Sequence, residues 1–357
     1  MEEIDWARYP SVAQLPTARA WLAIQAALGL APNTIAAYGR SLHDYLTFCR
    51  GRGVNPETTT RADVAAWVRD LRQRPHRQGA GITGLDSAVG LSNATLQQRL
   101  VAVRLFYDHL IEEGSRETNP VGRGRYTPGR SFGNHSERGL LPRVTHLPWI
   151  PTDEQWHAIV HASREEPIRN RVMLAFAYDA ALRREELCSL RTDDLDPAHR
   201  TLRVRAETTK TRRERVIPYS ATAGALLHSY LLHRRAISTA RGPLFLSESR
   251  RNHAAPLTLW TWSKVVRAIA LRAGVPHFST HTLRHLCLTD LARAGWELHT
   301  IAQFAGHRNP ATTLQYIHLS GRDLAAAMSR GMAQIHSWRM AQLSDETQET
   351  EREQSTP

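Results

Sequence analysis

The sequence predicts a mostly helical α+β protein of two domains, with one small β-hairpin in the second domain. Its 357 residues exceed the length of one ordinary compact domain and suit two. Apolar residues recur every three or four positions over most of the chain, which indicates helices, whereas strict alternation is confined to a short stretch at 201–206. A mixture of Gly, Pro, Arg and Ser at 119–150 has no periodicity, so we expect an interdomain linker there.

The first domain is expected to be all-helical over residues 11–118, after an N-terminal arm at 1–10. Thr60 with Asp63 resembles a capping box, and Gly114 ends the last apolar stripe. The predicted helices cover residues 11–29, Asn33 to Gly51, a stretch that starts at Thr60, and Ser92 to Gly114. A Pro/Gly-rich loop at 75–91 separates the last two helices.

The second domain is expected over residues 151–335. Thr152 and Gln155 form another capping-box pattern, which opens a helical stretch to about residue 190. Two apolar residues alternate with two arginines at 202–205, and 215–219 is expected to be the returning strand of a hairpin. Helices are predicted to make up most of the rest of this domain.

Composition excludes several classes of protein. Hydrophobic residues make up 41% of the chain, which is enough for packed cores. No apolar run approaches the roughly 18 residues of a membrane span, and the N-terminus lacks a signal core, so we expect no membrane association and a cytoplasmic location. The three cysteines (Cys49, Cys188 and Cys287) are far apart, which fits a reducing compartment and neither a disulfide framework nor a zinc cluster.

The formal net charge of +12 predicts a polyanionic partner, with nucleic acid as the first candidate. A basic protein without such a partner remains the simpler explanation of charge alone. Of the 46 basic residues, only Lys210 and Lys264 are lysine. Because arginine keeps its proton near neutral pH whereas lysine can act as an acid, a lysine with a chemical role should be easy to find.

Several short segments of the second domain carry residue types that can act on phosphate. They contain Arg183 before two glutamates, Lys210 in the hairpin turn, His281 and Arg284, His307 after a glycine, and Tyr316. His281 and Arg284 are three residues apart and therefore share a helix face. Taken singly, each has a simpler explanation: a surface ion pair for Arg183, a solvated turn for Lys210, and a core position for Tyr316.

The ordered set closely resembles the catalytic signature of the tyrosine recombinase (phage integrase) family. Arg183 is similar to its first catalytic arginine, Lys210 to its hairpin lysine, and Tyr316 to its nucleophile. His281 and Arg284 match the His-x-x-Arg box, and His307 matches a position that holds His or Trp. The resemblance implies a C-terminal tyrosine-recombinase catalytic domain, and it implies that the helical first half is a core-binding domain that contacts DNA. Ala181 and Ala305 depart from the family, which often has glycine and leucine there.

These residue types suit phosphodiester chemistry. Negative charge gathers on the non-bridging oxygens as a phenolate attacks phosphorus, and two guanidiniums stabilise that charge. Lysine can protonate the leaving 5′ oxygen, and histidines can move the phenolic proton near neutral pH. The resemblance implies a 3′-phosphotyrosine intermediate formed without metal, ATP or other cofactor. Three acidic residues at 193–196 could suggest a metal cluster, but a turn and helix cap is the simpler interpretation.

The resemblance also implies double-stranded DNA as partner, association with the nucleoid, and assembly with itself or with a related recombinase. A dimer on one site and a tetramer in synapsis are expected. Residues 319–340 carry an apolar face expected to dock on a neighbouring protomer, and 336–357 are expected to be a polar, acidic tail. Two alternatives stay open: a relaxase with type IB topoisomerase chemistry, and an inactive DNA-binding protein. Transposition, integration and dimer resolution are equally compatible roles.

Overall fold

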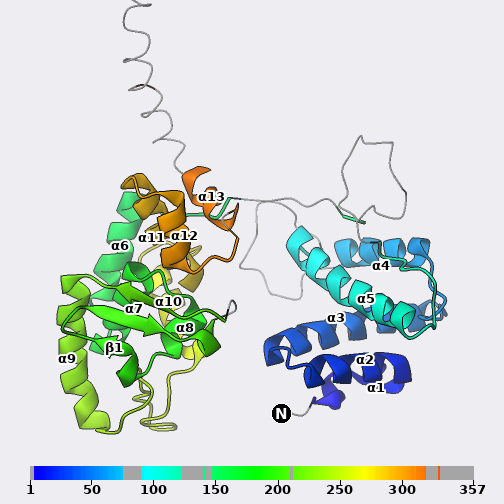
Figure 1. Cartoon of the computed structure of the whole chain (residues 1–357), viewed down its shortest axis with the longest axis horizontal. Coiled ribbons are helices and arrows are strands. Elements are labelled where there is room, and N and C mark those ends of the chain that lie inside the picture. Colours follow the sequence, from blue (N-terminus) through cyan, green and yellow to red (C-terminus); the bar gives the residue numbers. More distant parts are fainter. Residues whose placement is uncertain are drawn as a thin grey trace, which may run out of the picture. The chain divides into compact units, whose positions relative to one another are not determined.

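The chain divides into two compact units, Met1–His146 and Leu147–Pro357, and each is considered by itself (Figure 1). The computed structural model describes residues 4–74, 90–122, 140–141, 147–209, 212–309, 311–318 and 329. Lys210, most of the expected linker, the acidic tail at 336–357 and, except for Ser329, the segment at 319–340 expected to dock lie outside the described residues. Within the described part, no helix is both long and apolar enough to cross a bilayer.

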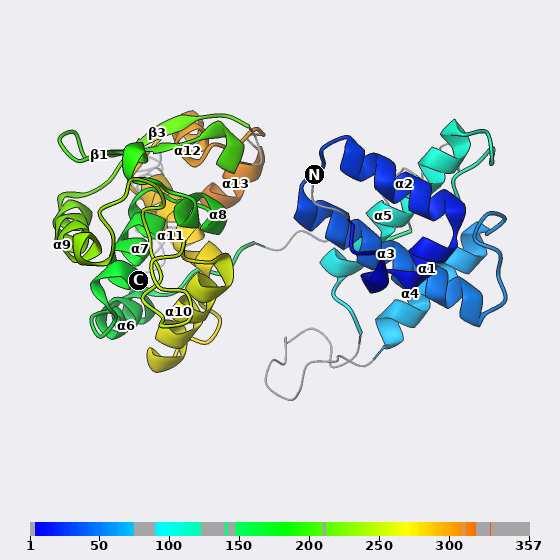
Figure 2. The same ribbon diagram turned by 90° about the horizontal axis from the view of Figure 1, so that it is seen from below.

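The first unit is all-helical, as the sequence predicts (Figure 2). Its elements are η1 (Trp6–Arg8), α1 (Pro10–Gln14), α2 (Pro16–Ala27), α3 (Pro32–Gly51), α4 (Arg61–Gln73) and α5 (Asn93–Glu112). The Thr60–Asp63 capping box forms at the start of α4, and the Ser92 side chain accepts from the Thr95 N–H at the start of α5. The single helix expected over 11–29 is wrong, because Leu15 is extended before Pro16 and separates α1 from α2.

Residues 4–10, which belong to the expected N-terminal arm, pack against the first unit. Ile4 and Trp6 pack against the core of the first unit, and Tyr9 is only 3% exposed. A Cβ placed on Gly39, within α3, would lie 2.8 Å from Cε2 of Tyr9. The absence of a side chain at Gly39 therefore lets the Tyr9 ring lie directly on the α3 backbone.

The second unit combines helices with one small sheet, which confirms the α+β class. Its helices are α6 (Asp153–Ser163), α7 (Ile168–Asp179), α8 (Arg184–Cys188), η3 (Thr192–Asp194), η4 (Ala206–Thr208), α9 (Ala221–Ile237), α10 (Leu259–Arg272), α11 (Thr280–Arg293), α12 (Leu298–Ala305) and α13 (Ala311–His318). Its strands are β1 (Leu195–Asp196), β2 (Thr201–Val204) and β3 (Arg215–Pro218). They form an antiparallel sheet in the order β1-β2-β3, with Leu202 opposite Ile217. The hairpin was predicted, whereas β1 was not. The nearby Asp194 carboxylate accepts from the Arg191 N–H and so caps η3.

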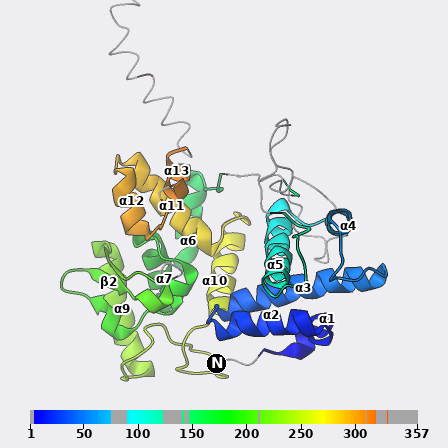
Figure 3. The same ribbon diagram turned by 45° about the vertical axis from the view of Figure 1, so that its right-hand side comes forward.

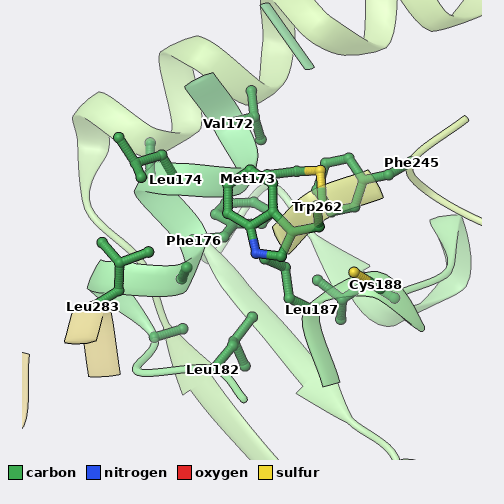
Figure 4. Packing of buried hydrophobic residues seen from close by; sticks show 14 of the residues in the cluster. Val172, Met173, Leu174, Phe176, Leu182, Leu187, Cys188, Phe245, Trp262 and Leu283 are labelled. Carbon is green, nitrogen blue, oxygen red and sulfur yellow. The ribbon is translucent and has the colours of Figure 1, made fainter. Parts of the chain in front are cut away.

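Helix α7 has no exposed residue, and its apolar side chains pack against those of other elements (Figure 4). Phe176 and Met173 have no exposed surface and pack in one cluster with Trp262 of α10 and Phe245. A smaller cluster joins α11, α12 and α13, which lie together in Figure 3. Its members are Ala181, Cys287, Leu288, Ile301, Ala305 and Tyr316. Helices α11 and α13 carry His281, Arg284 and Tyr316, and His307 lies between α12 and α13, so this packing positions four of the residues singled out for chemistry.

Gly39→Ala should destabilise the first unit although alanine favours helices. Overpacking against the buried Tyr9 ring costs about 1–3 kcal/mol, which outweighs a helix-propensity gain of up to about 1 kcal/mol. Gly51→Ala is the matched control, because no atom lies within 4 Å of a Cβ at this position in the same helix. Urea unfolding of the full chain measures the stability of both variants, and hydrogen exchange identifies the transition that belongs to the first unit. Equal stability of the two variants would contradict close packing at Gly39.

Candidate active site

Arg183 lies at the entrance to α8 and is fixed by a glutamate one turn later. Its backbone N–H donates to Oε2 of Glu186 at 2.9 Å, and its Nη1 donates to Oε1 of the same carboxylate at 2.8 Å. The carboxylate thereby caps the short helix and orients the guanidinium at once. The Arg183 side chain remains 21% exposed, so it can still contact a ligand.

Glu186 is a buried carboxylate shared by two arginines. Its side chain has no exposed surface, and Arg215 of β3 donates to it through Nη2 at 2.7 Å and Nη1 at 3.2 Å. Burial opposes ionisation, but the hydrogen bonds and charge of Arg215, assisted by Arg183, lower the pKa of Glu186 to about 2. Glu186 is therefore ionised at neutral pH and connects the sheet to α8.

Arg284 is the most deeply buried cation of the site, at 4% exposure. From α11 it donates through Nη1 to the Ala181 carbonyl and through Nη2 to the Ala305 carbonyl, both at 2.6 Å. Burial, with the repulsion of Arg183 next, lowers the pKa of Arg284 to about 10, which leaves it protonated at neutral pH. Its guanidinium thus joins the end of α12 to the turn that precedes α8.

The two backbone segments that meet Arg284 have unusual conformations. Ala181 has φ of 45°, a left-handed conformation that costs an alanine roughly 1–2 kcal/mol. Glycine adopts this conformation without that cost, which explains why the family often has glycine where this chain has Ala181. Gly306, just after α12, has φ of 64°, and a Cβ there would lie 3.0 Å from Nη1 of Arg215. Gly306 therefore allows both the turn into His307 and the approach of Arg215.

His307 joins Arg284 to the tyrosine helix. Its Nε2 lies 3.0 Å from Nη2 of Arg284, and its Nδ1 lies 2.9 Å from Oγ1 of Thr313 in α13. Because a guanidinium can only donate, Nε2 must accept, and the proton of the neutral ring is on Nδ1. Burial, followed by the charges of Arg284 and Arg183, lowers the pKa of His307 to about 3, so the ring is neutral.

Tyr316 is held between two histidine rings and is only 1% exposed. Its ring is parallel to that of His307, with 6.1 Å between centroids and 7° between planes. Its hydroxyl lies 3.0 Å from Nδ1 of His285. Burial raises the pKa of Tyr316, and it outweighs the charges of Arg284 and Arg183, which act to lower it.

The structure brings Arg183, Arg284, His307 and Tyr316 into one connected cluster and leaves His281 at its edge. His281 is exposed on α11, one turn before His285. Lys210 lies outside the described residues, between η4 and β3. Within the part of the chain that the structure describes, no group of three or more His, Cys, Asp or Glu residues could hold a metal ion.

Sequence analysis missed three residues of this cluster: Glu186, Arg215 and His285. Glu186 was taken for part of a surface ion pair, and Arg215 was seen only as the start of a strand. A usable pattern existed for His285, which follows His281 by four residues and therefore shares its helix face. No local pattern could have paired Glu186 with Arg215, because they are 29 residues apart in the chain.

Comparisons with known proteins match both parts of the chain. The phage integrase family model matches residues 151–322, and the model of the phage integrase N-terminal SAM-like domain matches residues 21–114. Tyrosine recombinase XerD of Listeria monocytogenes is 27% identical over 297 residues, covering 82% of this chain and 90% of the relative. Tyrosine recombinase XerC of Pelobacter propionicus is 29% identical over 296 residues, covering 82% and 86%.

Two solved structures share the fold. One is the XerH site-specific recombinase bound to a palindromic difH substrate, with a TM-score of 0.63 and 18% identity over 83% of this chain and 79% of that one. The other is the Tn1549 transposon integrase in complex with a circular intermediate DNA, with a TM-score of 0.62 and 18% identity over 87% and 98%. Fold and sequence together define an enzyme of the DNA-recombining class. The chain belongs to the tyrosine recombinase (phage integrase) family.

Glu186→Gln should remove a pH-dependent part of the stability of the second unit. Since the folded-state pKa of Glu186 is about 2 and its ordinary value is 4.5, the ionised carboxylate contributes about 3 kcal/mol above pH 4.5, which is lost as pH falls towards 2. The variant should be less stable by about this amount at pH 7, and the two proteins should converge in acid. Urea unfolding at several pH values measures the difference. Glu185→Gln, one position away and only partly buried, is the control; an equal loss in both variants would contradict the network.

Proposed function

We propose that this tyrosine recombinase breaks and rejoins double-stranded DNA at a specific site through a 3′-phosphotyrosine bond to Tyr316. The observation that carries the proposal is the convergence of Arg183, Arg284, His307 and Tyr316 from separate stretches of chain onto one hydrogen-bonded and stacked cluster. We assign residues 151–335 to the catalytic domain and 11–118 to a core-binding domain. The family models matched at 151–322 and 21–114 support this assignment.

The proposed reaction uses the cluster as follows. Arg183 and Arg284 bind the non-bridging oxygens of the scissile phosphate, and His281 and His307 lie beside them. The Tyr316 oxygen bonds to phosphorus, the bond to the 5′ oxygen breaks, and Lys210 gives that oxygen a proton. The phosphotyrosine conserves the energy of the phosphodiester, so attack by a 5′ hydroxyl reseals DNA without ATP.

We further propose that the enzyme acts on DNA as a dimer on one site and as a tetramer in synapsis. Of the two structures with this fold, one is bound to a palindromic difH substrate and the other to a circular intermediate DNA, which supports DNA as the partner here. A protein with this substrate would work at the nucleoid, in the cytoplasm. Sequencing host DNA fragments recovered covalently bound to the protein would identify the site. From that site, a duplex with a nick beside the scissile bond can be synthesised, and it is called the nicked duplex below.

Tyr316→Phe should bind the nicked duplex but form no covalent adduct. The substitution removes only the hydroxyl that bonds to phosphorus, and the ring can still stack on His307. Tyr219→Phe is a matched control, because its buried hydroxyl has no hydrogen-bond partner among the described residues. Denaturing gels measure the adduct, and gel shift measures binding. An adduct that persists in purified Tyr316→Phe would contradict the proposed nucleophile.

Lys210→Ala should form adduct on ordinary DNA more slowly than the parental protein, by a factor on the order of 100 to 10,000, because the 5′ oxygen then leaves without a proton. A nicked duplex with sulfur in the 5′-bridging position should restore most of the rate, since a thiolate needs no proton to leave. Lys264→Ala is the control, and its ammonium instead lies 3.4 Å from the centroid of the Trp260 ring. Equal impairment on both substrates would mean that Lys210 only binds phosphate.

A further inference from the structure

The hydroxyl of Tyr316 lies beside a histidine nitrogen that can take its proton. Nδ1 of His285 lies 3.0 Å from it, and the two rings lie 5.7 Å apart between centroids, at 38°. Tyr316 is only 1% exposed, so bulk water has little access to the phenol. We infer that His285 is a catalytic residue that accepts the proton of Tyr316 as the phenolic oxygen attacks phosphorus. The inference rests on the proposed function, since it requires Tyr316 to be the nucleophile.

His307 is poorly arranged for this role although it also contacts Tyr316. Its Nε2 lone pair accepts from Arg284, and its Nδ1 carries a proton towards Thr313, which is fully buried. Its ring is parallel to the tyrosine ring, so it presents a face to Tyr316 and no lone pair. His307 therefore orients Arg284 and the tyrosine ring, whereas His285 meets the reacting atom.

The charge state of His285 suits an acceptor. The groups that act on it are His281 and Arg284 of its own helix, Tyr316 of α13, and His307 after α12. Burial, then His281 and Arg284, lower the pKa of His285 to about 4, so the ring is neutral near pH 7. A phosphate bound to Arg284 would offset part of that repulsion. The basicity of His285 would then rise only when DNA occupies the site.

The proposed step balances without any further reactant. The proton moves from the Tyr316 oxygen to Nδ1 of His285, while that oxygen forms its bond to phosphorus. The bond between phosphorus and the 5′ oxygen breaks, and its electron pair stays on that oxygen, which takes a proton from Lys210. In resealing, the attacking 5′ hydroxyl gives its proton to Lys210 and His285 returns its proton to the leaving tyrosine oxygen, so the enzyme ends in its starting state.

The test compares adduct formation by full-length parental protein and His285→Asn on the nicked duplex between pH 6 and 9. Asparagine places a polar atom near the position of Nδ1 but is a far weaker base. We expect unchanged binding and adduct formation slower by a factor on the order of 100 at pH 7. The variant rate should rise by up to about tenfold per pH unit, because hydroxide must then take the proton. In His285→Ala, added imidazole should restore adduct formation.

Two further variants separate a chemical role from a structural one. His299→Asn, at an exposed position on α12, should leave rate and pH profile unchanged. His307→Asn should be slow without the steep pH dependence and without rescue by imidazole. Melting temperatures confirm that each variant is folded.

Three outcomes would overturn the inference. If His285→Asn forms adduct at the parental rate and with the parental pH profile, His285 has no role in the reaction. If folded His285→Asn forms adduct more slowly by a factor that does not depend on pH, and imidazole does not rescue His285→Ala, the role of His285 is structural. Faster adduct formation would mean that His285 restrains Tyr316. Each differs from failure of the proposed function, in which the parental protein forms no adduct or Tyr316→Phe still forms one.

Discussion

The burial of the Arg284 guanidinium constrains the rest of the site. A buried cation is stable only when its donors find acceptors, and here the acceptors are the carbonyls of Ala181 and Ala305 and the ring of His307. These acceptors come from the turn before α8 and from the end of α12. The requirement to satisfy one side chain thus draws Arg183, at the start of α8, and His307, after α12, towards the same point.

A second constraint is the balance of charge around the cluster. Three guanidiniums, those of Arg183, Arg215 and Arg284, surround a single buried carboxylate, that of Glu186. Glu186 neutralises part of this charge, while the remaining positive charge is available to an anion. Burial is the main reason that the pKa values of His285 and His307 are lowered and both rings are neutral, and the positive charge of Arg284 acts in the same direction. A phosphate would relieve the repulsion, so the site is prepared for the charge of its substrate.

Local structure followed closely from local sequence. The capping boxes at Thr60 and Thr152 form as predicted, because they depend only on residues three positions apart. The hairpin of β2 and β3 forms because alternation fixes which side chains face the core. The helix expected over 11–29 was wrong because Pro16 acts on the residue before it. Local sequence did not show that Tyr9 is buried, because its burial depends on Gly39, some thirty positions away.

The sequence by itself determined the fold class, the family, and the order along the chain of the residues proposed for chemistry. Their types and spacing carry that information without any knowledge of contacts. Only the tertiary structure decided that Glu186 is buried between two arginines, that His307 is committed to Arg284 and Thr313, and that His285 meets the Tyr316 hydroxyl. Helical periodicity tells which face a side chain occupies but not which distant segment packs on that face. The packing of α11, α12 and α13 around one buried cation decides it.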